Sequence, residues 1–485
     1  MTSSSRLGLV RRAPGFGLLF LATAGSAFGT YLAAIALVVH VKVETGSGLW
    51  VAALLIAEFA PIVVIGLLFG PLVDRLSRRR LMVVSDLVRG VLFLALMLVD
   101  DPAVVVAVAG LVGVATGFFR PAAYAGLPNL VPDEELTNAN SLLQTVETLA
   151  WMIGPVLAGL MLTVWSPSVP YAVNAVTFLV SAALIARIPE SKLRSEEPLT
   201  AGHWRDVADG LRLVVTTPPL RTVLVVWSAV VVGNAAVNVA EVFFAQDVLQ
   251  AGNVGFGVIV GASGVGLAIG SYLAAPAIGR VGLRRHYVAA IALMGFGWGA
   301  AALSSSIWVA VPFVVAATIG NGAAIVANQL FVQRGATDRY RGRALATIMS
   351  VNYAALGIAM AIAGVATDAF GARAVWLAAA AIFVLSALAT VALTRWLKGA
   401  REERLLEAHA EAAARSLAGA PCDARPRSQP VPEDGRASGL ERIAALLEEI
   451  ERRRELEAGR RAKRSASQPL RSLDPTGGTE PSLER

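Results

Sequence analysis

Two glutamates lie within long apolar runs of this sequence, where a carboxyl could carry a proton. Glu58 lies in the run Leu49 to Val73 and Glu147 in the run Ser141 to Trp165, and neither has a Lys or Arg within one helical turn. Burial away from water favours the neutral, protonated carboxyl. We therefore expect proton coupling at Glu58 and Glu147. For Glu58 the alternative is a protonated carboxyl that only hydrogen-bonds to a neighbouring helix.

Other polar side chains recur at helical spacing inside apolar runs. Gln144 and Trp151 flank Glu147 on one face of the fifth run, and the seventh and tenth runs carry similar stripes. Contact with lipid is costly for such stripes, so they face other helices or a watery cavity. Glu241, near the outer end of its run, could bind a cationic group. The side chains expected to bind a substrate are Gln144, Trp151, Asn234, Asn238, Glu241, Asn321 and Asn328.

A short turn rich in arginine separates the second and third apolar runs. The stretch Gly70 to Arg80 holds four arginines and one aspartate. Arginines near the ends of membrane helices stay on the cytoplasmic side, so this turn sets the orientation of its neighbours. Beyond it, Asp86 and Arg89 are three residues apart and should pair on one helical face. The residues expected to form a cytoplasmic gate are Gly70, Asp74, Arg75, Arg78, Arg79, Asp86 and Arg89.

The elements that must position these residues are apolar runs long enough to cross a bilayer, which takes about 20 residues each. The chain has 485 residues, 55% hydrophobic and 16% charged, a composition that excludes a soluble protein. Twelve spans are predicted: Phe16 to Val39, Leu49 to Val73, Leu81 to Val99, Ala103 to Phe119, Ser141 to Trp165, Tyr171 to Ile188, Leu220 to Phe244, Phe256 to Ile278, Tyr287 to Leu303, Ile307 to Leu330, Ala344 to Thr367 and Ala374 to Trp396.

We predict an all-α membrane protein whose twelve transmembrane helices form two pseudo-symmetric halves of six, with both termini cytoplasmic. The turn at Gly70 has a degenerate counterpart about 200 residues later, at Gly279 to Arg285, which favours an internal repeat. The tail is either a solvated appendage or pairs through its second predicted helix, Leu440 to Arg464, with a protein partner or with itself. The predicted parts are the N-terminal half 1–188, a central cytoplasmic loop 189–219, the C-terminal half 220–397, and a charged tail 398–485, partly helical and partly disordered.

Several classes of function are disfavoured by the sequence. The single cysteine, Cys422, lies in the polar tail, so neither an intrachain disulfide nor a cysteine-based metal cluster can form. No stretch matches the phosphate-binding pattern G-x-x-x-x-G-K-S/T, so ATP is not the expected energy source. The net charge of +7 reports topology and contact with lipid headgroups rather than nucleic-acid binding. We expect no enzyme activity, no cofactor and no metal site.

Two motifs resemble a known family. The turn beginning at Gly70 reads G-x-x-x-D-R-x-x-R-R, and the fifth run contains Gly154-Pro155-Val156-Leu157-Ala158-Gly159. They resemble the cytoplasmic signature and the antiporter motif of major facilitator superfamily transporters, in the exporter branch of the enterobactin exporter and macrolide efflux proteins. Ser77 and Ala158 replace family glycines. Glycine and proline thin and bend a helix, so Gly154, Pro155 and Gly159 are expected to serve close helix packing.

The resemblance, which covers about residues 12 to 398, implies a secondary active transporter of the cell membrane. It implies export of a hydrophobic or amphipathic small molecule, such as a drug, siderophore or secondary metabolite, by proton antiport with alternating access. The implied partners are this substrate, protons and membrane lipids. Two alternatives stay open: a metabolite importer of the same fold, and a membrane sensor or scaffold that acts through the tail.

Overall fold

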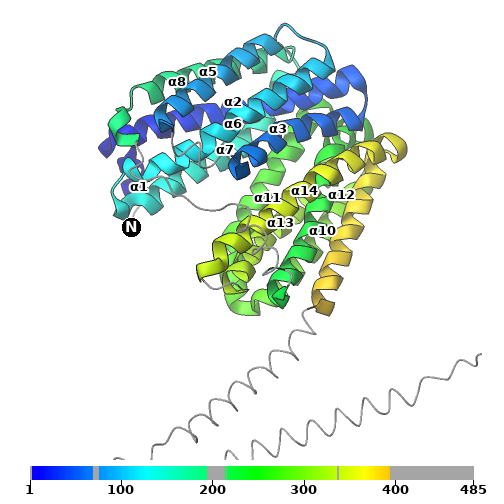
Figure 1. The fold of residues 1–485 in the computed structure, drawn as a ribbon. Coiled ribbons are helices and arrows are strands. Elements are labelled where there is room, and N and C mark those ends of the chain that lie inside the picture. The colour runs from blue at the N-terminus through cyan, green and yellow to red at the C-terminus, as the bar shows by residue number, and fades with distance from the viewer. Residues whose placement is uncertain (1–2, 69–75, 194–213, 215, 336–337, 394–485) are drawn as a thin grey trace, which may run out of the picture. The chain divides into compact units, whose positions relative to one another are not determined.

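The computed structural model describes residues 3–68, 76–193, 214, 216–335 and 338–393, all of them within one compact unit, residues 1–405 (Figure 1). The predicted tail, 398–485, and most of the predicted central loop lie outside the described residues. Within the described ranges the regular elements are all helical, which confirms the predicted all-α class. Among the described residues, eleven helices are long and apolar enough to cross a membrane.

The first-half helices run from blue to cyan in Figure 1. They and the short helices that follow them are α1 (Ser3–Arg12), α2 (Pro14–Thr45), α3 (Gly48–Leu68), α5 (Arg78–Leu96), α6 (Pro102–Gly126), η1 (Leu127–Asn129), η2 (Asp133–Glu135), α7 (Leu136–Met161), α8 (Ser168–Ala186) and η3 (Glu190–Leu193). The second-half helices run from green to yellow. They are α10 (Pro218–Phe243), the π-helix η4 (Phe244–Val248), α11 (Gly252–Val281), α12 (Leu283–Leu303), α13 (Ile307–Gly335), α14 (Asp338–Phe370) and a last span, Ala372–Leu393.

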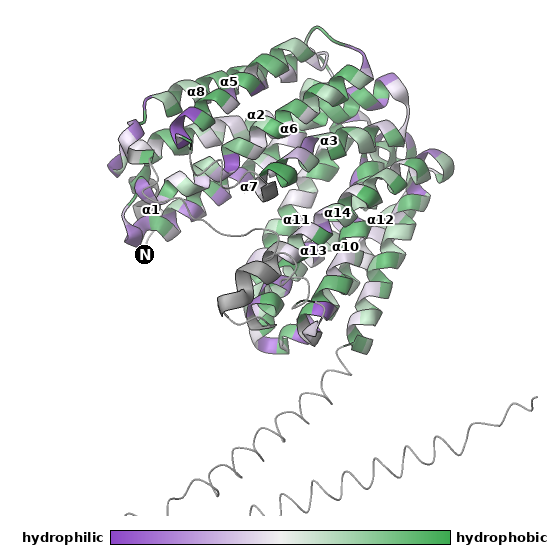
Figure 2. Cartoon of the chain, in the orientation of Figure 1, coloured by the Kyte–Doolittle hydropathy of each residue, from purple (hydrophilic) through white to green (hydrophobic). Residues whose placement is uncertain are grey.

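Helix α5 is the predicted third span, yet it is not among the eleven. It begins with three arginines and carries Asp86 and Arg89, so its sequence is less apolar than that of the other spans. It nevertheless packs against α6 and α8, in the place a third span would take in the first half. The count of twelve spans therefore stays a prediction. Figure 2 shows mainly hydrophobic helix bodies, with hydrophilic residues gathered mostly at α1 and at helix ends.

Local signals explain where several helices begin and end. Helix α2 continues past its apolar run to Thr45 and stops at Gly46, whose φ of 61° is left-handed and whose N–H bonds to the Lys42 carbonyl. Helix α6 begins at Pro102, and the Asp101 carboxylate caps it by accepting from two backbone N–H groups. A left-handed glycine thus ends one helix and a carboxylate cap starts another, at positions that hydropathy alone does not mark.

In the described part of the chain, the two most extensive interfaces between the halves are those of α3 with α14 and of α7 with α11. Counted with α5 as the third span, these are the second with the eleventh and the fifth with the eighth, so a shift of six helices exchanges them. At the second interface the backbones meet directly. A Cβ on Gly159 would lie 2.5 Å from the Asn253 carbonyl oxygen, and one on Gly257 would lie 2.2 Å from that of Pro155. Only glycine permits this approach.

Candidate functional site

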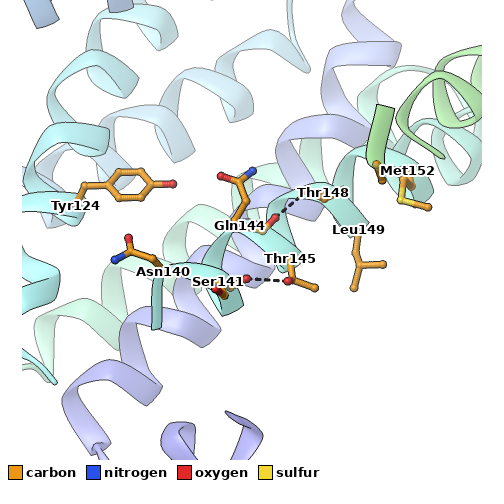
Figure 3. A pocket seen from close by; sticks show the side chains of 9 residues that line it. Tyr124, Asn140, Ser141, Gln144, Thr145, Thr148, Leu149 and Met152 are labelled. Atoms are coloured by element: carbon orange, nitrogen blue, oxygen red, sulfur yellow. Dashed lines mark hydrogen bonds between the residues drawn. The ribbon is translucent and has the colours of Figure 1, made fainter. Parts of the chain in front are cut away.

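The polar face of α7 lines two adjoining cavities. The first, of ≈ 430 Å³, and the second, of ≈ 630 Å³, share three lining residues, Tyr124, Gln144 and Thr148. In Figure 3, Tyr124 of α6 extends across the second cavity toward α7. The first is lined by Tyr31, Arg120, Tyr124, Gln144, Glu147, Thr148, Trp151 and Leu267. The second is lined by Tyr124, Asn140, Ser141, Gln144, Thr145, Thr148, Leu149, Met152 and Ala268. Helices of both halves therefore contribute.

An ion pair lies in the first cavity. The Arg120 guanidinium donates to Glu147 Oε2 at 3.1 Å, and the Tyr124 hydroxyl lies 3.5 Å from Oε1. The Glu147 side chain is 16% exposed, whereas that of Arg120 is 51% exposed. Glu147 lies eleven residues from the start of α7, about 16 Å along the helix at 1.5 Å per residue. The pair is therefore near the middle of this span.

Arg120 is the site residue that sequence reasoning missed. The predicted fourth span ended at Phe119, one residue earlier, because an arginine and Pro121 follow. Helix α6 passes through Pro121 and ends at Gly126, so Arg120 lies inside the helix. The small and apolar stretch that follows Pro121 was the signal that the helix continues.

Hydroxyl groups along α7 are already bonded to their own helix. Ser141 donates to the Thr137 carbonyl at 2.8 Å, Thr145 to the Ser141 carbonyl at 2.7 Å, and Thr148 to the Gln144 carbonyl at 2.8 Å (Figure 3 draws the last two). Each hydroxyl has one hydrogen and two lone pairs, so only acceptor capacity remains for a ligand. The α7 wall of the second cavity is thus chiefly a hydrogen-bond acceptor.

The structure brings together only part of the predicted substrate residues. Gln144 and Trp151 lie beside Glu147 in the first cavity. The five predicted residues of the second half line neither cavity: Asn234, Asn238, Glu241, Asn321 and Asn328. Glu241 is 7% exposed, and the side-chain oxygens of both α13 asparagines are buried without a hydrogen-bond partner among the described residues. A substrate role for these five stays a prediction.

Glu58 lies half-buried in α3, away from both cavities. Across the described part of the chain its carboxyl has no hydrogen-bond or ion-pair partner. Helix α3 lacks one backbone hydrogen bond next to Glu58, because Pro61 has no N–H to donate to the Ala57 carbonyl. Gly113 of α6 packs against this turn, and a Cβ there would lie 2.5 Å from the Glu58 carbonyl oxygen.

The described part of the predicted gate binds within the first half. Gly70, Asp74 and Arg75 lie outside the described residues. Arg78 donates to the Ala125 carbonyl at 2.9 Å, and Arg79 donates to the Ala186 carbonyl, so both cations lie at helix C-termini, where the helix dipole favours them. Ser77, which replaces a family glycine, caps α5 by accepting from the Arg80 N–H.

Asp86 and Arg89 form the ion pair that their spacing indicates. Asp86 is fully buried and Arg89 is 5% exposed. The Ser181 hydroxyl donates to Asp86 at 2.6 Å, and the Arg89 guanidinium lies between the rings of Phe119, at 4.4 Å, and Phe178, at 4.3 Å. Every partner belongs to the first half. The pair therefore makes contacts only within that half among the described residues. Its gate role stays a prediction.

Polar contacts between the halves gather at the face opposite to Arg78. Lys42 pairs with Asp247 at 2.5 Å, and the Asn253 amide donates to the Leu162 carbonyl at 3.0 Å. The contact between α7 and α11 runs from this face as far as Met152 and Gly264. The two cavities begin where this contact ends. The halves thus close the site at this face.

The sequence agrees with a family model. The model of the Major Facilitator Superfamily matches residues 19–252 and 228–454. The chain belongs to this superfamily. Macrolide efflux protein A of Streptococcus pyogenes is 26% identical over 212 residues, 42% of this chain and 52% of that protein, so the chain spans about half its length. Multidrug efflux pump Tap of Mycolicibacterium fortuitum is 27% identical over 402 residues, 79% of this chain and 97% of that protein.

Solved structures share the fold. The nucleoside transporter NupG has a TM-score of 0.65 at 13% identity, covering 78% of this chain and 99% of that one. A bacterial homologue of the iron transporter ferroportin, in an inward-facing state, has a TM-score of 0.65 at 15% identity, covering 78% and 98%. At these identities the likeness shows the fold alone. With eleven apolar helices, the superfamily member is a multi-pass membrane protein.

Proposed function

We propose that this superfamily member is a secondary active exporter of hydrophobic or amphipathic small molecules in the cell membrane. The observation that carries the proposal is the charged cavity beside α7 and α11, which contacts between the described parts of the two halves close at the face of Lys42 and Asp247. Relatives named for macrolide and multidrug efflux support export. With the arginine turn on the cytoplasmic side, the closed face is the outer one, so in this state the proposed exporter would load its substrate from the cytoplasm.

We infer proton antiport, with Glu58 as the first candidate for the proton carrier. A carrier must take up and lose a proton during the cycle, and an unpaired carboxyl in an apolar span can do so. Glu147 is bonded to Arg120, so its carboxylate already has a cationic partner in this state. Glu147 is therefore the second candidate, available for a proton only when Arg120 moves away.

Transport into inverted vesicles tests this function. Erythromycin, ethidium and doxorubicin are offered with an imposed pH gradient, acidic inside, and accumulation is measured with and without a protonophore. The wild-type chain should accumulate at least one of them, whereas Glu58→Gln should only let it equilibrate. Glu44→Gln removes a carboxyl at the exposed end of α2 and serves as the matched control.

Three results would contradict the proposal in different ways. Accumulation that survives the protonophore argues against proton antiport. Full gradient-driven accumulation by Glu58→Gln, by Glu147→Gln and by the double variant excludes both carboxyls as the proton carrier. Accumulation seen only in vesicles of the opposite orientation would favour the importer alternative.

A further inference from the structure

We propose that the substrate carries a protonated amine that displaces Arg120 from Glu147, joined to a body rich in hydroxyl or N–H groups that lies along α7. This inference rests on the proposed function, because it takes the two cavities as the transport site. It assigns Arg120 as a tethered cation that occupies the amine position while the cavity is empty. Three features support this assignment: the unequal exposure of the two side chains, the aromatic residues around them and the acceptor groups along α7.

Unequal exposure decides which member of the pair a ligand replaces. A buried charge that loses its partner is strongly destabilising, whereas a half-exposed guanidinium can turn into water at little cost. Glu147, at 16% exposed, needs a partner, and Arg120, at 51%, does not. A ligand carboxylate that bound Arg120 would leave Glu147 without a cationic partner. A ligand amine that binds Glu147 replaces Arg120 as that partner.

The groups around Glu147 suit an organic cation. Tyr31, Tyr124 and Trp151 line the same cavity, and aromatic faces attract cations. The Tyr124 hydroxyl, within 3.5 Å of Glu147, can hold the carboxylate in place as the amine arrives. Among the described residues no group of three His, Cys, Asp or Glu side chains could hold a metal ion, so an amine fits the site better than a metal does.

The second cavity fits the rest of the molecule. The hydroxyls of Ser141, Thr145 and Thr148 donate to α7 carbonyls and can only accept from a ligand, so the ligand supplies the donors at these three positions, whereas the Gln144 amide can donate as well as accept. The cavities share Tyr124, Gln144 and Thr148, so one molecule can reach both. Volumes of ≈ 430 and ≈ 630 Å³ lie within the usual range for drug-sized ligands, about 300 to 1,000 Å³.

Where Glu147, the second candidate, is the proton carrier, competition at its carboxylate also gives the coupling its sign. An amine and a proton cannot both occupy the ionised carboxylate, so each lowers the affinity for the other by the same factor. This mutual exclusion is what antiport requires. A carboxylate substrate at Arg120 would free Glu147 to be protonated, and proton and substrate would then bind together, as in symport. Amine substrates and proton antiport are thus linked by one ion pair.

Equilibrium binding to the purified full chain tests the proposal without any gradient. The probes are doxorubicin, whose sugar carries an amine beside hydroxyl groups, and N-acetyl-doxorubicin, in which an amide replaces that amine. Doxorubicin fluorescence reports both. We expect doxorubicin to bind about tenfold more tightly, Glu147→Gln to abolish this preference, and Arg120→Gln to strengthen doxorubicin binding severalfold by removing the tethered competitor. Arg120→Lys keeps the competitor and should bind like the wild type.

Controls separate charge from folding. Glu44→Gln should leave both affinities unchanged. Thr145→Val should weaken both compounds alike, because it removes an acceptor from α7 and no charge. Equal affinity for the two probes in the wild type, no binding of either, or an unchanged preference in Glu147→Gln would overturn the substrate class. If the wild-type chain does not prefer doxorubicin in the binding assay but accumulates substrate under a pH gradient, only this inference is refuted. If it shows the preference but never accumulates substrate, only proton antiport is refuted.

Discussion

Asp368, at the end of α14, caps the helix that begins at Gly48. Its carboxylate accepts from the backbone N–H groups of Gly48 and Leu49 and from the Ser47 hydroxyl. The first N–H groups of a helix have no partner within the helix, and here a side chain of the other half supplies one. The backbones also touch, because a Cβ on Gly364 would lie 2.7 Å from the Gly48 carbonyl oxygen. This cap exists only while the halves are closed at this face.

Asp368→Ala should therefore favour opening of the closed face. Loss of a helix cap costs about 1 kcal/mol, a roughly fivefold shift in population. Spin labels on Val43→Cys and Phe370→Cys, both exposed near this face, can report the distance after Cys422→Ser removes the natural thiol. The matched control is Asp101→Ala, which removes a cap that lies wholly within the first half. Identical distance distributions in the two variants would exclude the cap as a latch.

Gly257→Ala should separate α7 from α11. The added methyl would lie 2.2 Å from the Pro155 carbonyl oxygen, which is backbone and cannot rotate away. We expect the same label pair to move apart and gradient-driven accumulation to fall at least tenfold. Gly25→Ala, where a Cβ meets nothing within 4 Å, is the control. Wild-type transport by Gly257→Ala would mean that α7 and α11 can shift to fit the added methyl group without loss of function.

Asp86→Asn should destabilise the first half. Removing one partner of a buried ion pair leaves the other charge unpaired, at a cost of about 3 kcal/mol or more. Thermal unfolding of the detergent-solubilised protein should therefore begin at a clearly lower temperature. Arg80→Gln provides the contrast, because Arg80 is 79% exposed and its pair with Glu190 should contribute little. Equal melting of both variants would count against a structural role for the buried pair.

Asp74→Asn should abolish transport while the protein is still inserted in the membrane. The prediction comes from the sequence motif, since Asp74 lies outside the described residues. The substitution removes the acidic member of the arginine turn and leaves the apolar spans intact. Insertion is measured by membrane fractionation and transport in inverted vesicles. Asp133→Asn, in another loop predicted to be cytoplasmic, is the control, and wild-type transport by Asp74→Asn would exclude the gate role.

Features within one helix could be predicted from the sequence, and contacts between helices could not. The face shared by Gln144, Glu147 and Trp151 follows from helical geometry, and the structure places all three in one cavity. The partner of Glu147 is 27 residues away on another helix, so spacing cannot report it. The Asp368 cap joins residues 320 positions apart and is equally invisible to periodicity.

The low hydropathy of α5, the predicted third span, has a physical reason. Asp86 and Arg89 lower the hydropathy of α5, but their charges are paired and packed between aromatic rings. A hydropathy window counts each charge as exposed to lipid. For the second-half asparagines the sequence was also incomplete. Helical spacing placed them on common helix faces, but it could not show whether those faces line a cavity.

Ser47 gives the cap of α3 a second acceptor. Its hydroxyl oxygen already lies 3.2 Å from the Leu49 N–H, within the same helix end. When Asp368 withdraws, this N–H can keep an acceptor, and water can reach the rest. The activation barrier to opening is then lower than the barrier for a helix end stripped of every partner. Ser47 therefore makes opening at this face less costly.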